Sequence, residues 1–358
     1  PSYRPDIGRF VGSRREDRQS ENGKGGIMKL GTIVIGGRST PIVRVDEDTA
    51  LSLADLYQAA TLGAAPPSVL ALIEAGPAEL DRVRAALKTV SAGLKKIDIR
   101  NADWQAPVTR PSKIFGVAFN NQALTEIAHV KPTVPMFFLK PPSALTGHNK
   151  PIMIGSDYGR TIPELELGVV IGKQGRNIPV DRAREHVFGY TIVNDVTSTG
   201  LKFQYDSIAI DMAPQNVEPV HVNWRRRRDA SDNELYFTYH TRSKGADSFG
   251  PMGPWLTTAD EVANPNDLEV LAFADNDPLT VDSTRNYQFR VEDIIAEASR
   301  YFTLEPGDIF HCGTTGKGVG KYPRGHLSLD LSRSEPVVSV EISGLGRLSN
   351  PVKHFKQT

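Results

Sequence analysis

Hydrophobic and polar residues alternate along several short stretches of this chain, a pattern typical of β-strands. The clearest stretch is residues 163–172, PELELGVVIG. One face of this strand is expected to carry four apolar side chains, those of Leu165, Leu167, Val169 and Ile171. Side chains two apart in a strand point to the same face, so Glu164 and Glu166 project together. Adjacent carboxylates repel each other, and their pairing in an otherwise apolar strand therefore needs an explanation.

The same patterns divide the chain into a small N-terminal part and a larger β-rich part. Residues 28–108 combine strand patterns (28–37 and 40–47) with helical patterns (51–63 and 78–90), which predicts a small α+β domain. The prolines in residues 104–113 are typical of a linker. Residues 109–358 are expected to form a β-rich catalytic domain with few helices. Its expected strands are 114–120, 135–140, 164–172, 189–195, 234–241, 307–313 and 337–344, and its expected helices are 180–189 and 291–304.

Composition narrows the possible partners and the compartment. The 42 basic and 42 acidic residues cancel, so nothing attracts the chain generally to nucleic acid or to an acidic membrane. The basic run WRRRRD, residues 224–229, is better explained as a solvated turn than as a nucleic-acid site. Cys312 is the only cysteine, which favours a reducing cytoplasm, and no apolar run is long enough to span a membrane. Residues 1–27 are charged and poor in apolar residues, and we expect them to be disordered.

A carboxylate pair on a strand is either a solvated face or a cation site, and a third acid favours the cation site. Asp195 ends the apolar strand pattern of residues 189–195. An unpaired buried charge is costly, so a buried strand rarely ends in an acid without a partner. Two glutamates and one aspartate form a hard, all-oxygen ligand set, which selects Mg²⁺, Mn²⁺ or Ca²⁺ rather than zinc.

Residues of about 110–355 resemble the fumarylacetoacetate hydrolase family, because a series of the family's motifs occurs in the family's order. These motifs are SKIFGVAFNN, MFFLKPPSAL, PELELGVVIGK, VFGYTIVNDVTS, SKGADSFGPMGPWL, LEPGDIFHCGTTGKGVG and EISGLGRLSNPV. The resemblance implies an α+β fold whose mixed β-strands form a roll or sandwich around the site. It also implies a homodimer and small-molecule substrates that are 2-oxo acids or diketo acids.

The resemblance further assigns roles to individual residues. It implies that Glu164, Glu166 and Asp195 hold one Mg²⁺ or Mn²⁺, with Ca²⁺ as a possible substitute in crystals. Lys244 matches the catalytic lysine, and Lys140 matches a substrate-binding position. A lysine is a compact charge that can hold a carboxylate or a developing enolate. Gly313 and Thr314, in the glycine-rich stretch, are expected to contact a substrate carboxylate through backbone N–H groups and the Thr314 hydroxyl.

The chain departs from the family in the motif of its lid. Many members carry Asn-Tyr-x-x-His-x-x-Glu there, whereas Asn120 of this chain is followed by Asn121, and the His and Glu positions hold Leu124 and Ile127. Glu126 and His129 are three residues apart, and on a helical turn they would share a face and could form the same acid–base pair in reversed order. A polar lid surface explains them equally well. His148 is a further candidate base, although a loop histidine is more often simply exposed.

These observations lead us to expect a metal-dependent hydrolase that cleaves a C–C bond of a 2,4-diketo acid or related 2-oxo acid. The altered lid leaves an isomerase, a decarboxylase or a dehydratase on a related 2-oxo acid as the alternative. A catalytically inactive relative that binds a small acid is the non-enzymatic alternative, and the intact set of three acids argues against it. The long segment between Asp195 and Lys244, which includes residues 199–243, is expected to cover the site or to extend a dimer contact.

Overall fold

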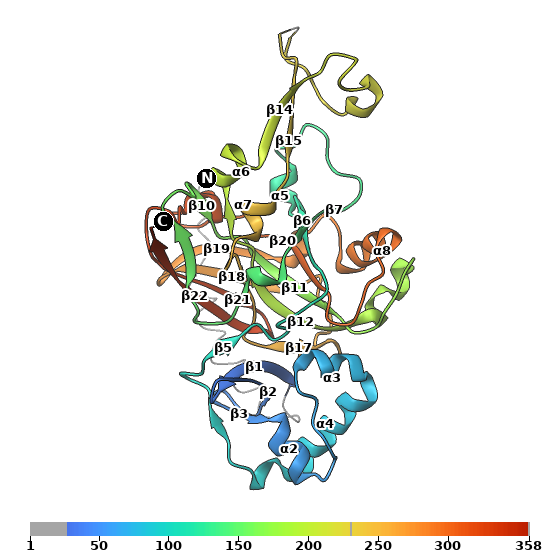
Figure 1. The fold of residues 1–358 in the computed structure, drawn as a ribbon, viewed down its shortest axis with the longest axis vertical. Helices are drawn as coiled ribbons and strands as arrows, with labels where there is room; N and C mark the ends of the chain where they lie inside the picture. The colour runs from blue at the N-terminus through green and yellow to red at the C-terminus, as the bar shows by residue number, and fades with distance from the viewer. Residues whose placement is uncertain (1–26, 230, 357–358) are drawn as a thin grey trace, which may run out of the picture.

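The computed structural model describes residues 27–229 and 231–356. An N-terminal unit, a β-rich body and a projecting two-stranded arm follow one another along the long axis of the molecule (Figure 1). Among the helices of this described part, none is long and apolar enough to cross a membrane. The disorder expected for residues 1–27 falls, except for Ile27, outside the described residues.

The N-terminal unit has the mixed helix and strand composition that its sequence patterns predict. Its elements are β1 (Lys29–Ile35), β2 (Arg38–Arg44), β3 (Thr49–Ser52), α2 (Leu53–Ala59), α3 (Val69–Ala75), α4 (Pro77–Val90), η1 (Ser91–Gly93), β4 (Ile97–Asp98) and β5 (Trp104–Gln105). The Ser52 hydroxyl caps α2 by accepting a hydrogen bond from Asp55 N, and Pro77 starts α4 at a position that needs no N–H donor. Both expected helices are present, and α3 is an additional short one.

The segment expected to be a linker is packed against the N-terminal sheet. Strand β5 pairs with β1, and Trp104 is buried with its ring 4.9 Å from the ring of Trp255. Strand β1 also pairs with β17 (Leu256–Thr258), which belongs to the β-rich body. One sheet therefore continues across the boundary drawn at residue 108, because backbone pairing, not proline content, decides the conformation of residues 104–105.

The main sheet has eleven strands and carries the elements that position the candidate site. Its strand order is β4-β3-β2-β1-β17-β12-β11-β20-β6-β7, with β5 attached to β1. The strands on the body side are β6 (Ile114–Ala118), β7 (Met136–Lys140), β11 (Leu165–Ile171), β12 (Val187–Asn194) and β20 (Ile309–Thr314). Strand β11 lies between β12 and β20 and is buried along its whole length. These positions confirm the expected strands around both acidic motifs.

A second sheet of five strands packs against the body side of the main sheet. Its order is β19-β18-β21-β22-β9. The strands are β9 (Ile152–Gly155), β18 (Glu269–Ala274), β19 (Asp277–Ser283), β21 (Val337–Ile342) and β22 (Gly346–Phe355). Apolar residues of both sheets form one core, which includes Leu165, Leu167 and Val169 of β11 as well as Val338, Val340 and Ile342 of β21. The expected β-rich α+β fold, with strands packed around a common core, is confirmed.

One expected helix is correct, and another is shorter than predicted. Helix α8 (Val291–Tyr301) buries Val291, Ile294, Ile295 and Ala298, which are spaced to share one face. Residues 180–189 were expected to form a helix, but the structure has a 3₁₀ helix, η3 (Val180–His186), followed directly by β12. The helix ends because Val187, the next residue, already pairs with Ile171 of β11.

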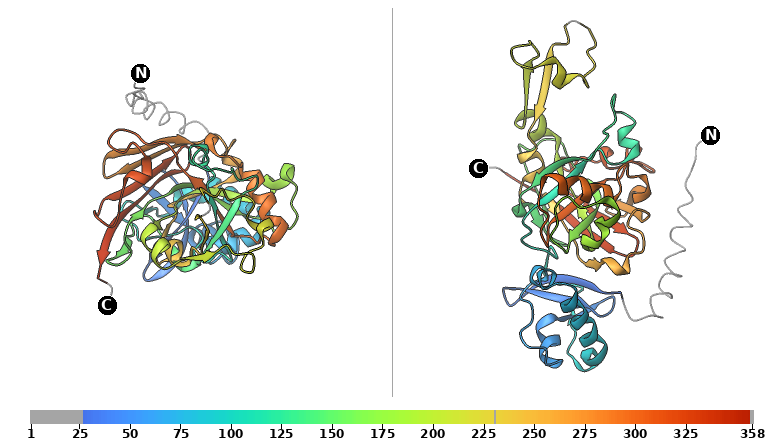
Figure 2. Two further views of the ribbon diagram at one scale, coloured as in Figure 1. Left: turned by 90° about the horizontal axis from the view of Figure 1, so that it is seen from above. Right: turned by 90° about the vertical axis from the view of Figure 1, so that its right-hand side faces the viewer.

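Short elements complete the fold, and one pair of strands leaves the body altogether. The short elements are α5 (Gln122–Thr125), η2 (Pro142–Ala144), β8 (Leu145–Thr146), β10 (Thr161–Ile162), β13 (Thr197–Ser198), α6 (Thr199–Gln204), η4 (Pro219–Val222), α7 (Thr241–Gly245), β16 (Gly250–Pro251), η5 (Ala259–Glu261), η6 (Thr284–Asn286) and η7 (Gly325–Ser328). Strands β14 (Ser207–Asp211) and β15 (Glu234–Thr238) pair only with each other and project from the body in Figure 1 and in the right-hand view of Figure 2. We call residues 199–243 the arm.

Candidate metal centre

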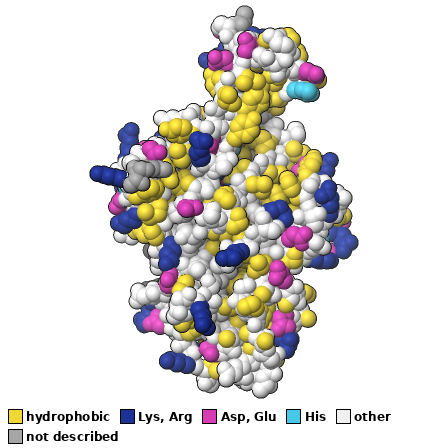
Figure 3. All heavy atoms as spheres, viewed as in Figure 1, with side chains coloured by type: hydrophobic (Ala, Val, Ile, Leu, Met, Phe, Trp, Pro, Cys, Tyr) yellow, Lys and Arg dark blue, Asp and Glu magenta, His cyan; other side chains and the backbone are white. Residues whose placement is uncertain are grey.

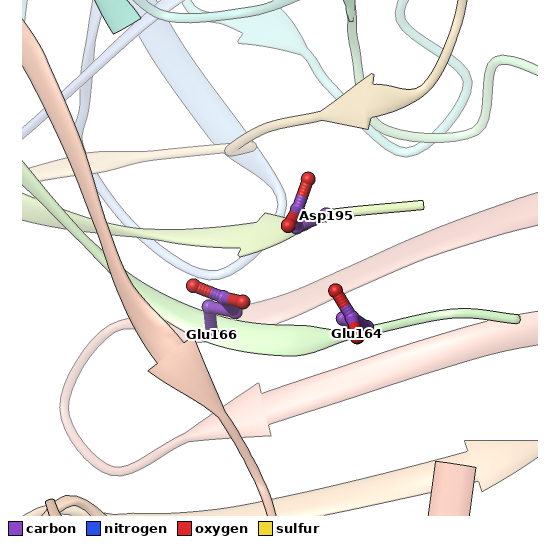
Figure 4. Close-up of side chains that lie close together, drawn as sticks. All are labelled: Glu164, Glu166 and Asp195. Carbon is purple, nitrogen blue, oxygen red and sulfur yellow. The ribbon is translucent and has the colours of Figure 1, made fainter. Parts of the chain in front are cut away.

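The three acids singled out by sequence come together where β11 begins and β12 ends. Glu164 directly precedes β11, Glu166 lies within it, and Asp195 directly follows β12. The two strands are neighbours, and Asp195 N donates a hydrogen bond of 2.7 Å to the Glu164 carbonyl oxygen. One carboxylate oxygen from each acid lies within 4.8 Å of the others (Figure 4). Three acids that are spread over 32 positions of the sequence thus form one compact cluster in the structure.

Neighbouring polar groups hold these carboxylates in place. Thr197 Oγ1 donates to Glu164 Oε2 at 3.0 Å, and the Gly313 N–H donates to Glu166 Oε2 at 2.7 Å. Gly313 has a φ of +113°, and an added Cβ would lie 2.7 Å from the Cβ of Asn120. Only glycine adopts this backbone conformation without strain or a clash. The absence of a side chain at Gly313 therefore allows its N–H to reach Glu166.

Both sequence-predicted lysines reach the cluster. Lys140 ends β7, and its Nζ lies 2.5 Å from Asp195 Oδ1. Lys244, in α7, forms ion pairs with both Glu164 and Asp195. Lys244 Nζ also lies 4.6 Å from the centre of the Phe138 ring, a cation–π distance. Since both lysines are buried, their charges act on the carboxylates with little screening by water.

The charges of the cluster are unevenly compensated. Burial alone would raise the pKa of Asp195, but the ammonium groups of Lys140 and Lys244 hold it below its ordinary value. Burial raises the pKa of Glu166 well above its ordinary value, and the charges of Asp195 and Glu164 raise it further. Among the described residues Glu166 forms no ion pair; its recorded partner is the N–H of Gly313. One buried carboxylate therefore has no ion-pair partner among the described residues, and only the nearby charge of Lys244 partly offsets the rise in its pKa.

This donor set fits a hard divalent cation. The three carboxylates converge, all the ligand atoms are oxygens, and a dication would compensate the charge that Lys140 and Lys244 leave on Glu166. The same residues hold no sulfur or imidazole ligand of the kind that structural zinc sites use. Glu164, Glu166 and Asp195 are thus suited to hold Mg²⁺ or Mn²⁺.

Gly313 and Thr314, expected to contact substrate, are already engaged with β11. The Gly313 N–H donates to Glu166, and Thr314 Oγ1 accepts a hydrogen bond of 3.1 Å from Leu165 N. Both residues therefore connect the glycine-rich segment of residues 313–320 to the strand that bears the glutamates. Their contact with a substrate remains a prediction.

The lid residues lie outside the cluster. Helix α5 ends at Thr125, so Glu126 and His129 do not share a helical turn. Both side chains are exposed, and no hydrogen bond or ion pair in the described part of the chain joins them. Their acid–base role remains a prediction, and it requires the segment to move toward the carboxylates.

A buried aspartate connects the base of the lid with the glycine-rich segment. Asp282 Oδ2 accepts hydrogen bonds from Asn121 Nδ2 at 3.0 Å and from Gly316 N at 2.7 Å. Asn121 in turn caps α5 by accepting from Ala123 N at 3.0 Å. Sequence patterns gave no sign of this role, because Asp282 occurs in an ordinary strand and its partners are distant along the chain.

His148, considered above as a candidate base, makes structural contacts in this protein. Its Nδ1 accepts a hydrogen bond of 3.0 Å from Ser349 N, and its ring packs edge-on against Trp104. Burial lowers the pKa of His148 to about 4, and the charge of Arg347 contributes. The neutral ring thus fastens the loop to β22, and no recorded contact brings it to the carboxylates.

Two other histidines lie at the cluster and were missed from sequence. His311, in β20, is fully buried, and its Nδ1 lies 3.9 Å from Asp195 Oδ1. Burial lowers the pKa of His311 to about 3 and also lowers the pKa of His326, which is buried in η7. His311 occurs within the quoted stretch HCGTTGKGVG, so strand periodicity could have pointed to it. His326 has no such signal.

Comparison with known sequences identifies relatives of this arrangement. Residues 113–353 match the family described as "Fumarylacetoacetate (FAA) hydrolase C-terminal". A mitochondrial oxaloacetate tautomerase of Xenopus laevis is 30% identical over 282 residues, which cover 78% of this chain and 76% of the relative. A 2,4-didehydro-3-deoxy-L-rhamnonate hydrolase of a Sphingomonas species is 32% identical over 223 residues, covering 62% of this chain and 67% of the relative.

Solved structures show the same fold. The maleylpyruvate hydrolase from Sphingobium sp. SYK-6, in complex with manganese(II) and pyruvate, superposes with a TM-score of 0.66 at 24% identity; the match covers 91% of this chain and 99% of that one. The fumarylacetoacetate hydrolase from Exiguobacterium antarcticum superposes with a TM-score of 0.65 at 25% identity, over 92% and 100% of the two chains. From the sequence match and the shared fold together, we conclude that the chain belongs to the fumarylacetoacetate hydrolase family.

Proposed function

We propose that this protein is a metal-dependent enzyme that enolises a 2-oxo acid and thereby interconverts its keto and enol forms. The observation that carries this proposal is the buried cluster of Glu164, Glu166 and Asp195, in which Glu166 forms no ion pair with any described residue. Mg²⁺ or Mn²⁺ is the proposed cofactor. When bound, such an ion polarises a chelated 2-oxo carbonyl and stabilises the negative charge of the enolate.

The two lysines supply the second part of the chemistry. Burial would lower the pKa of Lys244, but the charges of Asp195 and Glu164 raise it above its ordinary value. Lys244 therefore stays an ammonium at neutral pH and can hold the carboxylate of the substrate or the enolate oxygen. Lys140, from the neighbouring end of β7, lies beside Asp195; burial lowers the pKa of Lys140, and the charge of Asp195 opposes this shift. Both groups favour an anionic substrate, which fits a 2-oxo acid.

Two observations favour enolisation over hydrolysis as the overall reaction. Oxaloacetate tautomerases are relatives that match about four-fifths of this chain. In addition, the lid residues Glu126 and His129 are exposed and separate, so in the described structure these two side chains do not form an acid–base pair that could activate water. Enolisation needs a proton acceptor of modest strength once the carbonyl is polarised, whereas C–C hydrolysis also needs an activated water molecule.

Hydrolysis of a C–C bond in a 2,4-diketo acid is the second candidate function. It is favoured by the lid itself, which carries an acid and a histidine close together in sequence and begins at Asn121, a residue fixed to Asp282. If the segment closes, these groups approach the carboxylates. The named hydrolases among the relatives are compatible with this second reaction.

A direct assay tests the proposal. The enol form of oxaloacetate is mixed with metal-stripped protein, and its conversion to the keto form is followed by ultraviolet absorbance with EDTA, Mg²⁺ or Mn²⁺. We expect acceleration that depends on the metal, is lost in Glu166→Gln and persists in Glu185→Gln, which changes an exposed acid of η3. Equal rates with EDTA and with metal, or full activity of Glu166→Gln, would contradict the proposal.

A further inference from the structure

The base of the arm brings a lysine and a histidine close to the carboxylate cluster. Strand β14 leaves the body shortly after α6, which contains Lys202, and β15 returns shortly before His240 and α7. Helices α6 and α7 pack against each other, and α7 carries Lys244 into the cluster. Residues from both ends of the arm therefore lie beside the candidate metal centre.

The ring of Phe138 places His240 beside Lys244. Lys244 Nζ lies 4.6 Å from the centre of the Phe138 ring, and the centre of the His240 ring lies 6.1 Å from it. The Phe138 ring occupies the space over Gly116, where an added Cβ would lie 1.9 Å from Phe138 Cζ. Since Gly116 has no side chain, the aromatic ring can take this position and serve as an apolar floor next to the ammonium group.

Lys202 is a half-buried cation without a carboxylate partner. No ion pair within residues 27–229 and 231–356 involves it, and its Nζ lies 5.1 Å from the centre of the exposed Phe203 ring. Burial lowers the pKa of Lys202, and the charge of Lys244 lowers it further, whereas the charge of Glu164 opposes the shift. The two ammonium groups thus repel each other, and an anionic ligand beside both would offset this repulsion.

The buried acid at the base of the arm is engaged elsewhere. Asp206 Oδ2 accepts a hydrogen bond of 2.8 Å from Ser243 N, and Asp206 Oδ1 lies 3.9 Å from Arg242 Nε. Asp206 therefore holds α7 in place and neutralises Arg242. It forms no ion pair with Lys202 in the described part of the chain, so the charge of Lys202 stays open to a ligand.

His240 can add a hydrogen bond to that charge. Burial lowers the pKa of His240, and the charges of Lys202 and Lys244 lower it further, while the charge of Asp206 opposes the shift. The imidazole is therefore neutral at pH 7 and has one N–H to donate. Its Nδ1 lies 3.5 Å from Ser243 Oγ, at the limit of a hydrogen bond.

Apolar side chains surround this polar pair. Phe203, Tyr205 and Tyr239 are large, exposed residues at the base of the arm. Figure 3 shows hydrophobic side chains grouped along the visible face of the arm near its base. Apolar surroundings lower the local dielectric constant, so Lys202 attracts an anion here more strongly than a lysine on an open, polar surface would.

We propose that Lys202, His240 and Phe138 form a subsite for the second carboxylate of a 2-oxo acid whose first carboxylate and oxo group lie at the metal centre. Lys202 supplies the charge, His240 supplies an N–H, and the Phe138 ring contacts the carbon chain between the two carboxylates. The inference rests on the proposed function and adds the substrate class, a 2-oxo dicarboxylic acid.

The charge balance favours a diacid over a monoacid. The three acids of the cluster face its two buried lysines, so a bound dication leaves one net positive charge, which one substrate carboxylate neutralises. Lys202 adds a further positive charge beside Lys244. A second carboxylate on the same substrate neutralises it, whereas a monocarboxylic acid leaves the repulsion between the two lysines in place.

The test compares two acids that differ by one carboxylate and are not enolised. Malate and lactate are both 2-hydroxy acids, and titration calorimetry with the Mn²⁺-loaded protein at pH 7 gives a Kd for each. Charge-assisted hydrogen bonds are strong enough to change a Kd by about tenfold or more. We expect malate to bind at least about tenfold more tightly than lactate. In Lys202→Met this preference should fall to within about twofold, with lactate binding unchanged.

Conservative and distant variants serve as controls. Lys202→Arg should keep most of the preference for malate, and Lys173→Met, which alters an exposed lysine, should keep all of it. Equal affinities for the two acids in wild type, no binding of either, or an unchanged preference in Lys202→Met would overturn the subsite. Because neither acid is converted, a preference for malate in a protein that fails to enolise oxaloacetate would contradict the proposed function alone.

Discussion

Lys140 Nζ lies 2.5 Å from Asp195 Oδ1, and each of the two side chains is about 1% exposed. Removing one partner of a buried ion pair leaves an uncompensated charge, which typically costs about 3–5 kcal/mol. We expect Lys140→Met to lower the free energy of unfolding in EDTA by about 3 kcal/mol, the lower end of this range. The loss is limited because Lys244 still contacts Asp195. Urea unfolding at pH 7 measures this loss.

An exposed ion pair provides the matched control for that variant. Lys353 and Glu335 form a pair whose side chains are 59% and 39% exposed, and such pairs contribute about 0–1 kcal/mol. Lys353→Met should therefore change stability little. Saturating Mg²⁺ should restore part of the loss in Lys140→Met, since a dication supplies positive charge to the same carboxylate. Equal losses of unfolding free energy in Lys140→Met and Lys353→Met would show that the Lys140–Asp195 pair does not stabilise the fold as a buried ion pair.

Substitution of Glu166 should affect stability differently with and without metal. We expect Glu166→Gln to be at least as stable as wild type in EDTA, because it removes a buried carboxyl group that forms no ion pair with any described residue. At 100 times its dissociation constant a metal ion should stabilise wild type by about 2.7 kcal/mol, and Glu166→Gln by less than about 0.5 kcal/mol at the same concentration. Thermal unfolding with and without Mn²⁺ measures both effects, and an undiminished metal shift in the variant would rule Glu166 out as a ligand.

The pH dependence of the metal-free protein follows from the same residue. The pKa of Glu166 is raised above its ordinary value of 4.5, so between these two values the folded state binds more protons than the unfolded state. Stability in EDTA should therefore fall as the pH rises from 4.5 through the raised pKa. The Glu166→Gln variant should lack this part of the decline.

Strand periodicity was sufficient to place the acids, whereas contacts distant in sequence were not predictable. Glu164 directly precedes an apolar strand, Glu166 lies two positions further along, and Asp195 follows another strand, so adjacent pairing of β11 and β12 alone brings them together. Asp282 and His326 reach the site through tertiary packing of strands and loops that no local pattern encodes. The helix expected at residues 180–189 was wrong beyond His186, because strand pairing of Val187–Asn194 overrides the local pattern.

His148 should destabilise the protein in acid. Its pKa is about 4 in the folded state and 6.5 when exposed, so the unfolded state binds more protons between these values. Stability should therefore decline as the pH falls from 6.5 toward 4, by roughly 3 kcal/mol from this residue. Urea unfolding across this range should show a shallower decline in His148→Gln than in wild type and an unchanged one in His221→Gln, which alters an exposed histidine. Parallel curves for His148→Gln and wild type would disprove the buried, neutral state.

Asp282 should act as a positioning residue for substrate binding. In Asp282→Asn an amide nitrogen replaces one carboxylate oxygen, so the hydrogen bonds from Asn121 and Gly316 cannot both persist unchanged. We expect KM to rise about tenfold, equivalent to roughly 1.4 kcal/mol, with a smaller change in kcat and an unchanged metal-induced thermal shift. Hydrogen exchange in residues 119–135 should accelerate. Asp267→Asn, in an exposed pair with Arg285, is the control, and equal KM values in the two variants would contradict the role.

His129 distinguishes the two candidate reactions. Removing a general base typically lowers a rate by about 10² to 10⁴. If enolisation uses the carboxylate cluster and the lysines alone, His129→Ala should keep keto–enol conversion within a few-fold of wild type. If the chain also hydrolyses a 2,4-diketo acid through water activated at the lid, the same variant should lose that activity by about 10² or more while its metal-induced thermal shift persists.

The two activities are measured on one preparation of His129→Ala, with His221→Ala as the exposed-histidine control. Product masses report the hydrolysis, and absorbance reports the enolisation. A loss of both activities would place His129 in the enolisation step itself, against the proposed division of roles. Retention of both would make the lid a polar surface, and the proton would then move through groups buried at the cluster, among which His311 stands 3.9 Å from Asp195.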